Sequence, residues 1–201
     1  MSINVCNDRS MASITSLPSG VTGSSLVLLE TQTASSSATV SFTSNIDSTY
    51  KEYIFKFIDI HPATDNVDFT FNMSTDGGSN YNVTKTTTAF YAYHKEDGSE
   101  ANMAYTSGED LAQSTAFQPI IPDIGSDNDE CAGGTLHLFN PSSTTFVKNF
   151  ISTTQNAEAN NSSEENFTAG YFNTTNALTR VQFKFVSGNI DSGVIKLYGI
   201  S

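Results

Sequence analysis

The sequence predicts an all-β protein, an antiparallel β-sandwich of the jelly-roll type with at most one short helix. Short segments alternate apolar and polar residues, which is the period of a half-buried strand. Gly, Asn, Asp and Ser separate these segments, and strands do not alternate with helical patterns. Charged residues make up only 15% of the sequence. Aromatic residues are frequent, with 14 Phe and 8 Tyr, and these residue types favour the pleated surface of a sheet.

The length of 201 residues fits one domain. Residues 1–24 are rich in Ser, Asn, Gly and Pro and have few aliphatic anchors, so we expect an N-terminal arm there. Residues 25–201 are expected to form a single β-sandwich domain. No run approaches the roughly 20 apolar residues that a membrane-spanning helix needs, so no membrane insertion is expected.

The first expected strand is Leu26–Leu29, followed by a polar turn over residues 31–37 and a short strand over residues 39–43. Residues 53–60, YIFKFIDI, form the strongest β pattern. They are apolar on both faces, which predicts a central strand ending at His61-Pro62. Further strands are expected over residues 67–73, 84–93, 135–139, 145–153 and 167–172, with a short extended piece at Ile120, Ile121 and Ile124.

Two segments interrupt this pattern. Residues 107–117 offer a cap residue and acidic groups in a first turn, which favours a short helix or an irregular loop before Pro119. Residues 156–166 are polar and acidic with nothing to bury, and are therefore predicted to be a mobile loop.

The last twenty residues are predicted to form a hairpin that closes the core. Val181, Phe183 and Phe185 alternate with polar residues, and a second apolar run extends over residues 194–200. Gly188 and Gly193 provide turn residues between the two runs. Leaving the second run loose would forfeit about 1.5 to 3 kcal/mol for each large side chain, so it is expected to be an interior strand.

Nine basic and 21 acidic residues give a formal charge of -12. Nucleic acids and anionic membranes bind clustered Lys and Arg, so neither partner is expected. A structural calcium ion is the alternative use of the acidic residues, with Asp127, Asp129 and Glu130 as candidate ligands. Their spacing does not match an EF-hand loop, and ordinary turns explain them equally well.

The sequence contains no pattern typical of an enzyme. His61, His94 and His137 lie in or beside strands, without a partner at metal-ligand spacing. A nucleophile elbow is absent from the sequence. A glycosidase-like pair among Asp123, Asp127, Asp129 and Glu130 is the remaining catalytic alternative. A non-enzymatic protein without cofactors is therefore expected.

Four segments carry a resemblance to a known family: residues 47–62, residues 76–81 with the sequence DGGSNY, residues 136–141 with LHLFNP, and residues 187–200 with SGNIDSGVIKLYGI. Together they resemble a family of virion structural proteins of tailed phages, especially marine cyanophages. The resemblance covers most of residues 26–200 and consists of strand and turn motifs, so it assigns no site residues.

The resemblance implies a non-enzymatic particle component that is assembled in the host cytoplasm and exposed on the virion. It would be a tail-fibre or appendage module, or a decoration protein of the capsid. Other virion proteins are the implied partners, and homo-oligomers, often trimers, are typical of such appendages. The alternative is a carbohydrate-binding host-adhesion module that contacts a host surface glycan. Its candidate stacking groups are Tyr91, Tyr93, Tyr105 and Tyr171.

Overall fold

The computed structural model describes residues 26–200, so the predicted arm over residues 1–24 lies outside the described residues. Residues 26–200 form twelve strands and no helix, which confirms the all-β fold class. The strands are β1 (Leu26–Ser37), β2 (Val40–Phe42), β3 (Glu52–Pro62), β4 (Val67–Ser74), β5 (Lys85–Lys95), β6 (Ala101–Tyr105), β7 (Gln118–Ile124), β8 (Ala132–Phe139), β9 (Lys148–Glu158), β10 (Ser162–Phe172), β11 (Arg180–Phe185) and β12 (Ile190–Ile200).

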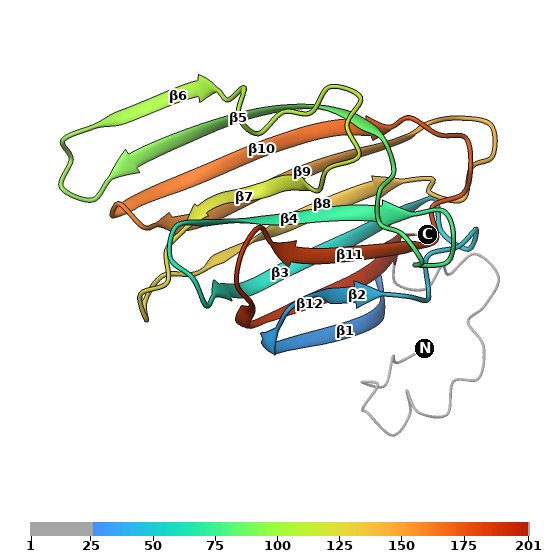
Figure 1. Cartoon of the computed structure of the whole chain (residues 1–201), viewed down its shortest axis with the longest axis horizontal. Coiled ribbons are helices and arrows are strands. Elements are labelled where there is room, and N and C mark those ends of the chain that lie inside the picture. The colour runs from blue at the N-terminus through green and yellow to red at the C-terminus, as the bar shows by residue number, and fades with distance from the viewer. Residues whose placement is uncertain (1–25, 201) are drawn as a thin grey trace, which may run out of the picture.

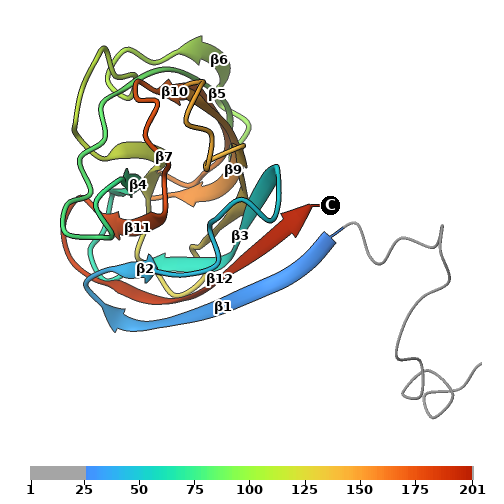
Figure 2. The ribbon, with the colours of Figure 1, turned by 90° about the vertical axis from the view of Figure 1, so that its right-hand side faces the viewer.

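The strands form two antiparallel layers that almost close into a barrel. The large layer has the order β1-β12-β3-β8-β9-β10-β5-β6, and the small layer, β7-β4-β11-β2, lies in front of it in Figure 1. One register pair, Ile124 opposite Glu158, joins β7 to the end of β9. On the other side of the molecule β2 lies beside β1 (Figure 2), so the layers meet along both sides.

Phenylalanine fills the space between the layers at the end formed by β3, β4 and β11. The ring of Phe183 lies 5.3 Å from Phe55 and 5.4 Å from Phe57, measured between ring centroids. It also contacts the rings of Phe42, Phe69 and Phe71. Most of these pairs are edge-to-face, an arrangement that adds to the free energy gained from burial.

The prediction that β11 and β12 form a hairpin is wrong. β11 pairs with β4 and β2 in the small layer, whereas β12 pairs with β1 and β3 in the large layer. The Gly- and Asn-containing segment between them therefore crosses from one layer to the other. Turn residues show where a strand ends but not which strand the next one will pair with. The prediction that the last run is an interior strand is confirmed, because β12 lies between β1 and β3.

Replacing Leu197 on β12 with Ala is expected to destabilise the fold by about 2 to 5 kcal/mol, because the side chain is fully buried and the change leaves a cavity. Equilibrium unfolding in urea measures this loss. A change below about 1 kcal/mol would show that the closing strand contributes little to the core.

β3 is a central strand, as predicted, and pairs with β12 and β8. Its pairing shifts between Phe57 and Ile60, where Asp59 has a φ of 51°. The shift turns Ile60 into the core and leaves Ile58 39% exposed. A strict period of two would place both isoleucines on one face, because it does not anticipate a bulge.

Two polar segments predicted as turn or loop belong to strands instead. Residues 31–37 complete β1, and residues 156–166 form the ends of β9 and β10 around a turn at residues 159–161. Residues 107–117 form an irregular loop rather than a helix. No helix long and apolar enough to cross a membrane occurs in the described part of the chain.

Candidate functional site

The inner faces of β9, β10 and β5 change from apolar to acidic along their length. Strand pairing places Phe150 near one end of this surface and Thr154 opposite Asn166 in the middle. Glu164, opposite Asn156, and Glu158 lie near the other end. These middle and end side chains are all buried. The interior therefore has a phenylalanine-filled half and a polar half.

Side chains of β9 hold β7 across the polar half. Thr154 Oγ1 donates a hydrogen bond to the carbonyl oxygen of Ile120 at 2.6 Å, and Asn156 Nδ2 donates to that of Pro122 at 3.0 Å. Gln118 Nε2 donates to the carbonyl oxygen of Glu109 at 2.7 Å, which fixes the preceding loop. These bonds replace the apolar packing that joins the layers elsewhere, and they leave room beside β7 for a pocket.

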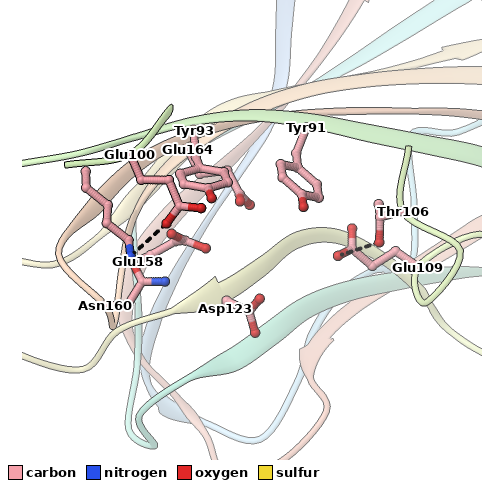
Figure 3. Close-up of a pocket in the computed structure, with 10 residues that line it drawn as sticks. Tyr91, Tyr93, Glu100, Thr106, Glu109, Asp123, Glu158, Asn160 and Glu164 are labelled. Atoms are coloured by element: carbon pink, nitrogen blue, oxygen red, sulfur yellow. Dashed lines mark hydrogen bonds and ion pairs between the residues drawn. The ribbon is translucent and has the colours of Figure 1, made fainter. Parts of the chain in front are cut away.

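The pocket has a volume of about 410 Å³, which is within the range of small-molecule sites. Figure 3 shows Tyr91 and Tyr93 pointing from β5 into the space that faces Asp123 on β7. The remaining lining comes from β10, the end of β9, the turn after it and the loop before β7. These residues are Lys95, Glu100, Thr106, Glu109, Glu158, Asn160 and Glu164.

Glu164 is the most deeply placed acid of the pocket. Its side chain is 4% exposed, and its Oε1 atom has no hydrogen-bond partner. Burial, together with the nearby Glu158 carboxylate, raises the pKa of Glu164 to about 8. Glu164 therefore holds a proton at neutral pH unless a cation enters the pocket.

Glu109 and Asp123 also have raised pKa values. Burial, with Asp68 and Asp123 nearby, raises the pKa of Glu109 to about 7. Burial also raises the pKa of Asp123, whose backbone has a φ of 49°. The carboxylates of Glu109, Asp123, Glu158 and Glu164 form no ion pair with any Lys, Arg or His of residues 26–200. The pocket therefore gathers four carboxyl groups without a paired cation, and near neutral pH protons on Glu164 and Glu109 remove part of their negative charge.

The pocket's own cation is engaged at its rim. Lys95 Nζ lies 2.9 Å from Glu100 Oε2. Figure 3 marks this ion pair by the dashed line that starts at Glu100. Tyr93 and Lys95 lower the pKa of Glu100, while Glu100 raises the pKa of Tyr93 to about 12. Lys95 and Glu100 therefore neutralise each other, and Lys95 forms no ion pair with Glu109, Asp123, Glu158 or Glu164.

The structure separates the four tyrosines predicted to stack on a glycan. Tyr91 and Tyr93 line the pocket on the inner face of β5. Tyr105 and Tyr171 lie on the outer face of the same layer, where they are paired opposite Phe90 and Thr86. The four do not form one platform.

The predicted acidic loop lies away from the pocket. The backbone N–H of Asp127 donates to Glu130 Oε2 at 2.7 Å, and the N–H of Glu130 donates to the carbonyl oxygen of Asp127 at 2.9 Å. Asp129 lies within this turn and is exposed. Within residues 26–200, no group of three or more His, Cys, Asp or Glu side chains is placed to hold a metal ion. A structural calcium ion at this loop stays a prediction.

The three histidines lie apart from the pocket. His61 lies 3.8 Å from Asp191, and His137 Nδ1 lies 2.6 Å from Glu52 Oε1 on the outer face of the large layer. His94 is exposed on the outer face of β5.

Sequence reasoning missed Glu109, Glu158 and Glu164, and placed Asp123 with the acidic loop instead. Residues 156–166 are polar at almost every position, so they show no alternation of apolar and polar residues that would predict a strand. One signal was available in the sequence. Asn156 and Glu158 are spaced by two before a short turn, and Glu164 and Asn166 are spaced by two after it. Comparisons with family models, curated proteins and solved structures found no match to this chain.

Proposed function

We propose that this protein is a non-enzymatic structural component of a tailed-phage particle, exposed as a tail-fibre or appendage module or as a capsid decoration protein. The sequence resemblance supports this role, and an antiparallel all-β domain is compatible with it. The observation that carries the assembly part of the proposal is an apolar surface on the outside of the large layer.

This assembly face consists of the outward-facing side chains of β5, β6, β9 and β10. Phe90 and Phe167 stack with their centroids 4.7 Å apart at its centre. Around them, Ile151 is 50% exposed, Tyr105 58% and Met103 69%. Monomeric proteins rarely expose contiguous apolar patches of this kind, because burying them in a partner is favourable.

Charge favours a second copy of the chain as the partner. The chain carries a net charge of -12, so copies repel each other across most surfaces. In β5, β6, β9 and β10, strand pairing places only one carboxylate, Glu165, among the outward-facing side chains. Asp110, which accepts a hydrogen bond from Tyr105 at the edge of the face, adds a second carboxylate. Two copies can therefore approach through this face with little like-charge repulsion. β6 is also an edge strand, with β5 as its only partner within the described residues.

The variant Ile151→Glu is expected to break the assembly into monomers, because it places a charge in the assembly face. Sedimentation velocity measures the change in mass. Val186→Glu is the matched control, since Val186 is 57% exposed but lies after β11, outside the assembly face. A monomeric wild-type protein, or an Ile151→Glu variant that stays associated, would count against this assembly face.

The place on the particle is tested separately by imaging the labelled protein on intact particles. Regularly spaced label on the shell supports a decoration protein, and label confined to the tail supports an appendage module. Particles that carry no label would contradict the virion role altogether.

The pocket favours a second candidate function, a carbohydrate-binding host-adhesion module. Its supporting observation is the pair Tyr91 and Tyr93, whose ring centroids lie 5.9 Å apart in a polar pocket of about 410 Å³. Aromatic rings beside hydrogen-bonding groups suit sugars, which have an apolar ring face and a polar edge. A glycan array tests this function. Absence of binding to every glycan would reject it and leave the structural role intact.

A further inference from the structure

Two buried acceptors next to the pocket have no donor. Glu164 Oε1 and Asn166 Oδ1 both lack a hydrogen-bond partner, and their side chains are 4% and 2% exposed. They follow one another on the inner face of β10, with Glu164 lining the pocket. A buried acceptor without a donor is costly and usually indicates that an ion, water or ligand belongs there. A ligand that displaces the Glu164 proton and donates hydrogen bonds would satisfy both oxygens.

The charge around these acceptors specifies the ligand further. Glu109, Asp123 and Glu158 surround the same space as Glu164, and none of them is paired with a cation in the described chain. Like charges gathered in a partly buried site repel each other, and a positive ligand relieves this repulsion. An ammonium group has three donors and one positive charge, which matches both requirements.

The aromatic side of the pocket favours an organic cation over a bare metal ion. Tyr91 and Tyr93 occupy one side of the pocket, and among residues 26–200 no group of three or more His, Cys, Asp or Glu side chains is placed to hold a metal ion. Tyrosine rings attract both organic cations and the C–H faces of sugars. The ligand therefore has a carbon framework as well as a charge.

We propose that the pocket binds an amino sugar, with the protonated amine among the carboxylates of Glu109, Asp123 and Glu164 and the sugar ring against Tyr91 and Tyr93. This inference rests on the second candidate function, the glycan-binding one, and names its ligand class. It does not depend on the position of the protein in a particle.

Isothermal titration calorimetry at about pH 7 with three probes tests the ligand class, because most of an amine is still protonated there, while Glu109 and Glu164 hold their protons less firmly than at lower pH. Glucosamine carries the amine and the ring, N-acetylglucosamine has the same ring without charge, and cadaverine has amines without a ring. Glucosamine is expected to bind at least about tenfold more tightly than each of the others. Calcium chloride serves as a fourth probe, and calcium binding at the pocket in place of glucosamine would overturn the inference.

Two pairs of variants locate the site. Glu164→Gln is expected to weaken glucosamine binding at least about tenfold, whereas Glu165→Gln, the next residue on the outer face, leaves it unchanged. Tyr91→Ala is expected to weaken binding, whereas Tyr171→Ala on the outer face does not. Thermal unfolding checks that each variant is folded. If Glu164→Gln binds glucosamine as the wild type does, the assigned site is wrong.

The outcomes separate this inference from the function on which it rests. If N-acetylglucosamine binds as tightly as glucosamine, the amine has no role and the inference fails, but glycan binding stands. If cadaverine equals glucosamine, the sugar ring has no role and the inference also fails. If no sugar binds here and the glycan array is also negative, both fail together.

Discussion

Replacing Phe183 with Ala is expected to destabilise the protein by about 3 to 5 kcal/mol, which would be a large part of the stability of a domain of this size. The side chain is completely buried on β11 and contacts five other phenylalanine rings across both layers. Truncation removes these contacts and leaves a cavity that strands held by hydrogen bonds cannot close. Urea unfolding followed by circular dichroism measures the loss.

Val186→Ala provides the control for this change. Val186 lies three positions further along the chain and is 57% exposed, so its truncation should change the unfolding free energy by less than about 0.5 kcal/mol. Equal effects of the two substitutions would show that the phenylalanine cluster is not the stabilising centre of the fold.

Raising the pH from about 5 to about 7 is expected to destabilise the wild-type protein by a few kcal/mol. Glu164 and Glu109 have folded-state pKa values of about 8 and about 7, above the ordinary value of 4.5. Between these values the folded state binds more protons than the unfolded state, so the unfolding free energy falls as the pH rises. The raised pKa of Asp123 acts in the same direction.

Glu164→Gln should remove on the order of 2 kcal/mol of this pH dependence, because the amide does not titrate. Glu109 and Asp123, whose pKa values are also raised, would continue to titrate in the variant. The window ends at about pH 7 because burial lowers the pKa of Lys85 to about 7, and above that pH this lysine reverses the trend. Urea unfolding at both pH values provides the measurement. A wild-type protein whose stability is the same at both, or a variant with an unchanged dependence, would contradict the electrostatics described for the pocket.

The apolar half of the fold was predictable because burial leaves a clear pattern in the sequence. β3 and β4 alternate large apolar side chains with smaller or polar ones, and both were expected near their observed bounds. Pairing was not predictable in the same way. β11 and β12 are adjacent in sequence yet lie in different layers, because long-range packing rather than the turn decides their partners.

The candidate site was only partly predictable. Tyr91 and Tyr93 were expected to contact a ligand, and they do line the pocket. Glu158 and Glu164 were assigned to a loop because buried polar side chains look like solvent-exposed ones in a sequence. What distinguishes them is the structure around them, since β7 covers them through hydrogen bonds from Thr154 and Asn156.

We infer that β5, β9 and β10 serve two purposes through alternation of their side chains. Inward-facing residues such as Glu164 and Tyr91 form the pocket, and outward-facing residues such as Ile151 and Phe90 form the assembly face. Successive residues of a strand point to opposite faces, so one set can change without the other.

Titrating glucosamine into the Ile151→Glu variant tests this separation most directly. We expect a monomer that binds glucosamine with an affinity within about twofold of the wild type, because the pocket is complete within one chain. Loss of glucosamine binding together with loss of assembly, in a variant that remains folded, would contradict it and show that the two faces depend on each other.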